Sequence, residues 1–326
     1  MLRLLLPLLL AASALHGESV LLVLHKSFSS LGFYSLDGRH QLDVPVGEHP
    51  HEMVISPDRR FVYISNNGTM RIEQPGEGGN TISVVDLALH QEVARISLGR
   101  FRRPHGLSLD AKSGALAVTA ELPEQELILI DTRRRAVVQT YPTRGQTSHM
   151  VTWGPGARWA FVSNSGSANV SAIDVISGKV QLIPAGQRPE GSVLSRDGRF
   201  LYVCNRESAS LTIIDTAKRE NAGSIATARG PVRIALTPDG RELVYACMHD
   251  KKVEFADPAA RRVLAAVPLP NSPVSISLSP DGQRAYASAE EQDTVYVISV
   301  PDHRLLRQFQ TSPSAAPDPV LELASP

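Results

Sequence analysis

The stretch FLYVCNRESASLTIID, residues 200–215, carries the pattern that decides the fold of this chain. Two short runs rich in β-branched and aromatic residues, Phe200–Asn205 and Leu211–Asp215, are separated by a polar turn. Residues of these types favour strands, so the stretch predicts two neighbouring β-strands, the first ending in Asn205 and the second in Asp215.

The same pair of strands recurs along the chain. The first strand is repeated in the strings VYISN (62–66), AFVSN (160–164) and LYVCN (201–205). The second strand ends at Asp86, Asp131, Asp174, Asp215 and Asp257, a spacing of 41 to 45 residues. Turn signals such as Thr237-Pro238-Asp239-Gly240 precede the first strand. Four short strands in each period of about 42 residues predict one blade of a β-propeller.

The number of repeats predicts seven blades. The recurring first strand begins near Leu21, Phe61, Ala115, Trp159, Phe200, Glu242 and Arg284. The chain therefore opens inside a blade, and it closes on an innermost strand at Val320–Leu323. We expect an all-β, seven-bladed propeller of four-stranded blades over residues 15–326, in which the carboxyl-terminal strand completes the first blade and removes free sheet edges.

Composition excludes two classes of protein. Lys plus Arg and Asp plus Glu both number 33, so the formal net charge is zero. A balanced surface does not displace the counterions of a polyanion, so no nucleic-acid partner is expected. The 42% of hydrophobic residues supply a sizeable core, which argues against disorder.

The first residues predict export. Arg3 precedes the apolar run Leu4–Ala11, and Ala12-Ser13-Ala14 follows with the small residues of a cleavage site. This order is typical of a signal peptide over residues 1–14, and the run is too short to span a membrane. We therefore expect a periplasmic or secreted protein without a membrane span.

Two cysteines, Cys204 and Cys247, fall in equivalent strands of successive repeats. Packed sheets lie about 10 Å apart, beyond disulfide reach. Two separate buried thiols are expected.

The innermost strands predict a functional funnel. Aligned in register, they begin at His51, His105, His149, Glu190, Val232, Val274 and Asp318. Circular symmetry gathers these positions around one rim of the axis. Imidazole and carboxylate groups are ligands of Zn, Cu, Mn or Fe, so His51, His105, His149 and Glu190 are the candidate ligands of a divalent transition metal. Without a metal, His105, His149 and Glu190 are candidate acid–base residues.

Charged residues near the same rim are candidate ligand-binding groups. Arg233 follows Val232, and Arg206 and Glu121 lie at the ends of recurring first strands, in Asn205-Arg206 and Ala120-Glu121. Guanidinium groups bind carboxylates and phosphates through paired hydrogen bonds, so Arg233, Arg206, Glu121 and His51 predict a site for a small anionic molecule.

One loop on this rim is longer than the others. Starting points of successive strands lie 54 residues apart between Phe61 and Ala115, and the surplus is the Gly-rich segment Gly68–Asn80, which carries Arg71 and Glu73. Long loops on a rigid scaffold are where binding residues concentrate.

The repeat also resembles a known family. Val62-Tyr63-Ile64-Ser65-Asn66, Thr81–Asp86 and Pro231–Gly240 are similar to the repeat phrases of YVTN-type, YncE-like propellers. The resemblance covers nearly the whole mature chain and implies a seven-bladed propeller. Related propellers include lactonase-type enzymes and the haem-d1 domain of cytochrome nitrite reductases.

The resemblance leaves three functions open, with catalysis undecided. The first is a propeller that binds a small anionic molecule or a metal ion in the funnel. The second is a metal-dependent, lactonase-like hydrolase or lyase that acts on a carbohydrate or carboxylated substrate. The third is a non-catalytic scaffold for a protein partner or a haem-d1-like cofactor carrier. The chain has no C-x-x-C-H string, so a c-type haem is not expected.

Overall fold

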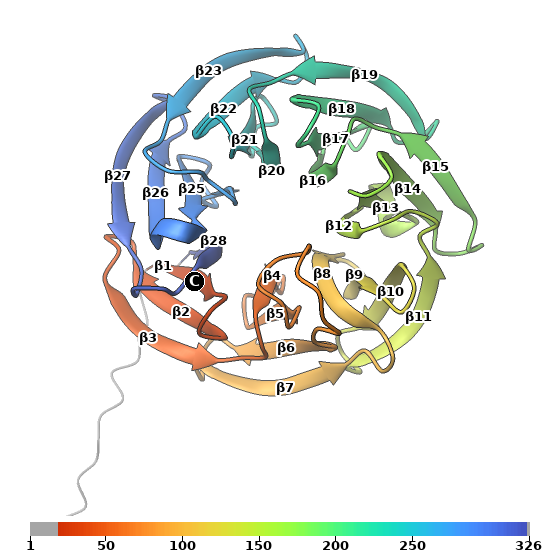
Figure 1. Ribbon diagram of the computed structural model, residues 1–326, viewed down its shortest axis with the longest axis horizontal. Coiled ribbons are helices and arrows are strands. Elements are labelled where there is room, and N and C mark those ends of the chain that lie inside the picture. Colours follow the sequence, from red (N-terminus) through yellow and green to blue (C-terminus); the bar gives the residue numbers. More distant parts are fainter. Residues whose placement is uncertain (1–18, 325–326) are drawn as a thin grey trace, which may run out of the picture.

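A computed structural model describes residues 19–324 and shows seven four-stranded antiparallel sheets arranged as a ring (Figure 1). The sheets are the blades of a β-propeller, so the predicted fold class and blade number are confirmed. The predicted signal peptide, residues 1–14, lies outside the described residues. Within residues 19–324, no helix has the length and apolar character needed to cross a membrane.

The blades follow one another in chain order, and each runs from an innermost to an outermost strand (Figure 1). Blade 1 contains β28 (Pro317–Leu323), β1 (Val20–His25), β2 (Ser30–Ser35) and β3 (His40–Pro45). Blade 2 contains β4 (Pro50–Ile55), β5 (Phe61–Asn66), β6 (Thr81–Asp86) and β7 (Gln91–Ser97). Blade 3 contains β8 (Arg102–Leu109), β9 (Ala115–Leu122), β10 (Glu126–Asp131) and β11 (Ala136–Pro142). Blade 4 contains β12 (Ser148–Trp153), β13 (Trp159–Asn164), β14 (Asn169–Asp174) and β15 (Val180–Pro184).

The remaining three blades also contain four strands each. Blade 5 contains β16 (Pro189–Leu194), β17 (Phe200–Asn205), β18 (Ser210–Asp215) and β19 (Glu220–Ala226). Blade 6 contains β20 (Pro231–Leu236), β21 (Leu243–Cys247), β22 (Lys252–Asp257) and β23 (Arg262–Pro268). Blade 7 contains β24 (Ser277–Leu278), β25 (Arg284–Ala289), β26 (Thr294–Ser299) and β27 (Arg304–Gln310). Two 3-10 turns, η1 (Pro155–Ala157) and η2 (Glu290–Gln292), lie between strands.

The carboxyl-terminal strand closes the ring. β28 pairs antiparallel with β1, with Val23 opposite Val320 and Val20 opposite Leu323. The predicted closure of the first blade is therefore confirmed. Because both ends of the described chain share one sheet, the inner edge of blade 1 is covered by a paired strand.

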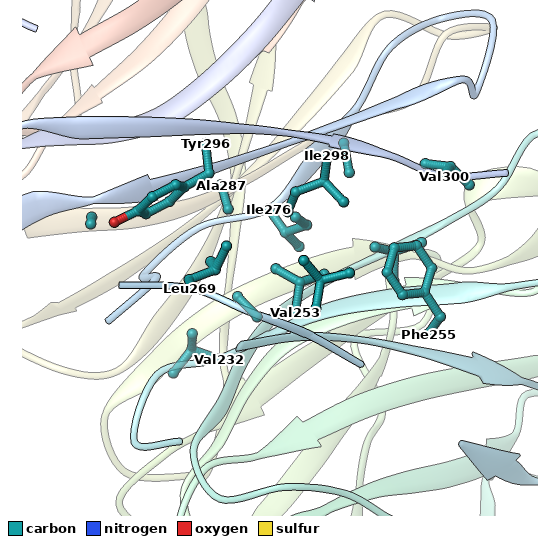
Figure 2. Close-up of a cluster of buried hydrophobic side chains, with 14 residues drawn as sticks. Val232, Val253, Phe255, Leu269, Ile276, Ala287, Tyr296, Ile298 and Val300 are labelled. Atoms are coloured by element: carbon teal, nitrogen blue, oxygen red, sulfur yellow. The ribbon is translucent and has the colours of Figure 1, made fainter. Parts of the chain in front are cut away.

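The core lies between adjacent blades. Figure 2 shows the cluster between blades 6 and 7, where Val253 and Phe255 of β22 pack near Ile298 of β26. The middle strands are buried on both faces because a blade lies on each side, whereas the outermost strand β23 alternates between exposed and partly buried residues. Cys204 and Cys247 are both buried, free thiols, as predicted.

The innermost strand of blade 7 is shorter than the repeat predicts. It was expected to begin near Val274 but covers only Ser277–Leu278. Pro270 and Pro273 lie just before it and have no N–H for a sheet ladder, although the amide of Val274 still donates to the Ser288 carbonyl at 2.8 Å. The regular sheet pairing of the innermost strand is therefore shorter in blade 7 than in the other blades.

Candidate functional site

A β-bulge near the start of the innermost strand positions the site residue in six of the seven blades. The ladder between β4 and β5 skips His51, and the ladder between β8 and β9 shifts across His105 and Gly106. The same shift occurs at His149, Glu190, Val232 and Asp318. A bulge interrupts the alternation of a strand and re-aims the extra side chain, which explains how residues of an inner strand all come to line the axis.

Hydroxyl groups of the neighbouring strand stabilise these bulges. Ser65 Oγ donates to the carbonyl of His105 at 2.8 Å, and Thr119 Oγ1 donates to the carbonyl of His149 at 2.7 Å. A Cβ atom at Gly106 would lie 2.6 Å from the His149 carbonyl, so only glycine permits this approach of blades 3 and 4. The backbones of His105 and His149 are thus each held by a hydroxyl group of the preceding blade.

The bulged residues surround a cavity of about 290 Å³ at one mouth of the axis. Its lining includes the predicted residues His51, His105, His149, Glu190, Arg206 and Arg233. Six further charged residues not assigned to the site beforehand also contribute: Lys26, Asp318, Glu290, Glu291 and, from the long loop, Arg71 and Glu73. The cavity is at the small end of the range for ligand sites, which suits a small metabolite.

The three histidines form a hydrogen-bonded relay. His51 Nδ1 lies 3.0 Å from His105 Nε2, and His149 Nε2 lies 3.1 Å from the same His105 nitrogen. At the two ends, His51 Nε2 contacts the Thr69 carbonyl at 2.7 Å and His149 Nδ1 contacts Glu190 Oε2 at 2.5 Å. All three rings are buried.

The partners at the two ends determine where the protons lie. The Thr69 carbonyl and the Glu190 carboxylate can only accept, so His51 carries its proton on Nε2 and His149 carries one on Nδ1. In the neutral rings, the two nitrogens that face His105 are therefore lone pairs. His105 Nε2 has one proton for two acceptors, and His105 Nδ1 is buried without a hydrogen-bond partner.

Burial keeps two of these rings neutral. Burial lowers the pKa of His51 well below 6.5, and the nearby charge of Lys26 lowers it further. Burial likewise lowers the pKa of His105, with additional repulsion from the neighbouring imidazoles of His149 and His51. Near neutral pH both rings are available to accept a proton.

Glu190 stays ionised despite its burial. Burial alone raises the pKa of this carboxyl, but the imidazole of His149 and the guanidinium groups of Arg206 and Arg233 together lower it to about 2. Arg206 Nη1 lies 3.6 Å and Arg233 Nη1 lies 3.9 Å from the carboxylate. Glu190 therefore provides a fixed negative charge at the end of the relay.

The predicted anion-binding arginine at position 233 is already paired. Arg233 donates to Glu52 Oε1 from Nη2 at 2.6 Å and from Nε at 3.0 Å. Glu52 lies one residue after His51, on the other side of the ring, and the prediction missed it because its partner is 181 positions away in the sequence. Arg233 serves the site by linking two carboxylates, Glu52 and Glu190.

Lys26 and Asp318 form the wall near blade 1. Lys26 Nζ lies 3.1 Å from Glu290 Oε1 and 3.8 Å from Asp318 Oδ2. Burial raises the pKa of Asp318 to about 7, although Lys26 opposes the shift. Lys26, Arg206 and Glu290 each come directly after the end of the second strand of a blade. The repeat alignment could therefore have located Lys26 and Glu290.

The structure gives the surroundings of two predicted groups, the metal ligands and Glu121. No group of three or more His, Cys, Asp or Glu side chains within residues 19–324 is arranged to hold a metal ion. In this structure His51, His105, His149 and Glu190 contact one another, and their predicted role as metal ligands stays a prediction. Glu121 does not line the cavity; it lies 3.2 Å from Arg103 Nε, and burial raises its pKa to about 7.

The fold and the site define a seven-bladed propeller with a buried His–Glu–Arg cluster at its axis. No protein-family model matches the sequence, and no curated protein does either. The Pseudomonas aeruginosa periplasmic gluconolactonase PpgL is similar in structure, with a TM-score of 0.77, 16% identity and coverage of 94% of this chain and 99% of that chain.

Two further solved structures share the fold. Hydrazine synthase of Kuenenia stuttgartiensis has a TM-score of 0.73 and 23% identity, and the match covers 86% of this chain and 92% of that chain. The dihydro-heme d1 dehydrogenase NirN has a TM-score of 0.66 and 16% identity over 90% of this chain and 64% of that chain. At these identities the likeness shows the fold alone.

Proposed function

We propose that the funnel is an acid–base site that hydrolyses a small polar lactone or related ester. The observation that carries the proposal is the 2.5 Å contact between His149 Nδ1 and Glu190 Oε2 at the end of the three-imidazole relay. A buried carboxylate that orients an imidazole and stabilises its charged form is a recurrent arrangement in hydrolytic catalysis. The structural likeness to a gluconolactonase supports the choice of a lactone.

The relay explains how a ring of low pKa can serve as a base. A water molecule attacks the lactone carbonyl carbon and gives its proton to His105 Nδ1, which has no other partner. The proton on His105 Nε2 then passes to His149 Nε2, 3.1 Å away. Glu190 stabilises the resulting imidazolium. When the ring C–O bond breaks, the same proton path runs backwards and protonates the leaving alkoxide.

This proposal assigns different roles to the predicted site residues. His105 is the base, His149 and Glu190 hold the transferred charge, and Arg206 and Arg233 keep Glu190 ionised. His51 accepts a hydrogen bond at Nδ1 and positions His105.

The test is lactone hydrolysis followed by proton release in a pH-stat. The purified protein is given D-glucono-1,5-lactone and a panel of five- and six-membered lactones at pH 7, with spontaneous hydrolysis subtracted. His105→Asn and Glu190→Gln should each reduce kcat about 10²- to 10⁴-fold, the usual contribution of acid–base catalysis.

A matched control comes from a second His–Glu pair. His303 Nε2 lies 2.9 Å from Glu242 Oε2, but neither residue lines the cavity. His303→Asn should leave hydrolysis unchanged. Absence of turnover across the panel, or full activity in His105→Asn, contradicts the proposal.

We also propose that the protein is exported. The signal-peptide pattern of residues 1–14 supports this, as does the likeness to a gluconolactonase described as periplasmic. Mass spectrometry of the mature protein should find an amino terminus directly after Ala14. An intact Met1 in protein from the native host contradicts export.

A further inference from the structure

The long loop between β5 and β6 is firmly held at its base. We call residues 67–80 the strap. The amide of Gly79 donates to the Asn67 carbonyl at 2.6 Å, and the amide of Arg103 donates to the Gly79 carbonyl at 2.8 Å. The Arg103 side chain also donates to the Ile72 carbonyl. These bonds fix where the strap leaves blade 2 and direct its middle part, residues 70–73, to the cavity that it lines.

Two charged side chains of the strap contact distant blades. Arg71 Nη2 lies 3.1 Å from Glu291 Oε1, beside blade 7. Glu73 Oε1 lies 2.6 Å from Arg188 Nη2 and 3.5 Å from Arg206 Nη2, both beside blade 5. A loop that leaves blade 2, lines the cavity and contacts blades 5 and 7 extends over the mouth of the site.

Of the two arginines that hold Glu73, Arg206 lines the cavity. Arg206 Nη1 lies 3.6 Å from Glu190, so one guanidinium joins the Glu73 carboxylate to the carboxylate of the relay. Arg206 lines the cavity and is only 18% exposed, whereas the Glu73 side chain is 58% exposed. Solvent therefore reaches the Glu73 carboxylate more readily than the Arg206 guanidinium that pairs with it.

We propose that Arg188 and Arg206 form a subsite for a carboxylate of the ligand, and that Glu73 fills this subsite until the ligand displaces it. The inference rests on the proposed function in one respect. Hydrolysis of a lactone converts a neutral ring into a hydroxy acid, so the carboxylate that competes with Glu73 is the one formed in the reaction. Product formation would thereby release the strap from blade 5.

A ligand carboxylate can displace Glu73 because it replaces one carboxylate with another. Exposed ion pairs contribute little to stability, and the Arg71–Glu291 pair, with both side chains 68% exposed, adds little resistance to opening. A carboxylate from the ligand restores the bonds that Glu73 gives up. Release of the strap also acts on the relay, since the Thr69 carbonyl that accepts from His51 Nε2 belongs to the strap.

The test is calorimetric titration with sodium gluconate, a hydroxy acid, and with sorbitol as its uncharged polyol counterpart. Glu73→Gln removes the internal competitor and should bind gluconate about fivefold more tightly than the unaltered protein, the value expected for loss of one exposed ion pair. Sorbitol binding should not change. Glu77→Gln is the matched control, because Glu77 lies on the same strap, is 83% exposed and contacts Arg102.

A second variant tests the arginines. Arg206→Gln or Arg188→Gln, placed in the Glu73→Gln protein, should weaken gluconate about 10- to 100-fold, as expected for a charge-assisted hydrogen bond. Equal gluconate affinity in the unaltered, Glu73→Gln and Glu77→Gln proteins overturns the proposal, as does failure of all of them to bind gluconate.

Equilibrium binding separates this inference from the proposed function. If the protein hydrolyses lactones but its gluconate affinity does not change in Glu73→Gln, the subsite proposal is contradicted and the proposed hydrolysis is not. Tighter gluconate binding by Glu73→Gln in a protein that hydrolyses no lactone supports the subsite and contradicts the proposed hydrolysis.

Discussion

Glu190→Gln removes one negative charge from the centre of the site with little change in shape. The Glu190 side chain is 2% exposed and contacts His149, Arg206 and Arg233. An amide keeps the size of the group but cannot balance the two guanidinium groups. The change therefore measures how strongly the folded protein depends on this charge.

The pKa of Glu190 gives the expected magnitude. It falls from 4.5 to about 2 in the folded protein. Each pKa unit corresponds to about 1.36 kcal/mol, so ionised Glu190 stabilises the fold by roughly 3 kcal/mol. Because the folded pKa is the lower one, this stabilisation is fully present above pH 4.5 and disappears as the pH falls towards 2.

Urea unfolding followed by circular dichroism, at pH 7, 5 and 3, measures the effect. The free energy of unfolding of Glu190→Gln should be lower than that of the unaltered protein at pH 7 and 5, with a smaller difference at pH 3. Glu207→Gln is the control: Glu207 lies 3.4 Å from Arg206 Nε but is 47% exposed, so its removal should change stability by less than about 0.5 kcal/mol.

Two results would refute the reasoning. If Glu190→Gln is as stable as the unaltered protein at pH 7, the charge does not stabilise the cluster. If the difference stays constant from pH 7 to pH 3, the loss comes from packing and not from ionisation.

Two further predictions concern other charged residues of the funnel, Arg233 and Asp318. Arg233→Gln leaves Glu52 without its partner and should lower the free energy of unfolding by about 3 kcal/mol, whereas Arg229→Gln, at a side chain 74% exposed, should change it by less than about 0.5 kcal/mol in the same denaturation assay. Asp318 has a pKa of about 7 in the folded protein against 3.8 ordinarily, so folding holds a proton that the unfolded chain releases and the stability of the unaltered protein falls as pH rises between these values. Asp318→Asn should therefore have the higher melting temperature at pH 8 and lose this advantage at pH 4; an advantage equal at both values contradicts the assigned pKa.

The architecture could be predicted because a propeller repeats in sequence what it repeats in space. Asp residues spaced by 41 to 45 positions set the blades, and the position of the last strand set the closure of blade 1. The alignment of the inner strands also brought His51, His105 and His149 to one cavity, because equivalent positions of a ring face the same axis.

The chemistry of the cluster could not be read from that alignment. Three histidines and a glutamate suit a metal or a proton relay equally well, and the alignment does not give the orientation of the rings. Glu121 occupies the repeat position of Arg206, but it pairs with Arg103 and does not line the cavity. Which partner a side chain contacts depends on its exact direction, and the period of the repeat does not encode that direction.

The sequence by itself determined the ring, its seven blades and the place of His51, His105, His149 and Glu190 at its mouth, because these follow from local strand patterns and their period. The tertiary structure alone decided the partners: Glu52 with Arg233, Glu73 with Arg188, and the order of the relay. These pairs join segments of the chain separated by up to 181 residues. These pairs form only when the whole ring closes, so a local stretch of sequence does not predict them.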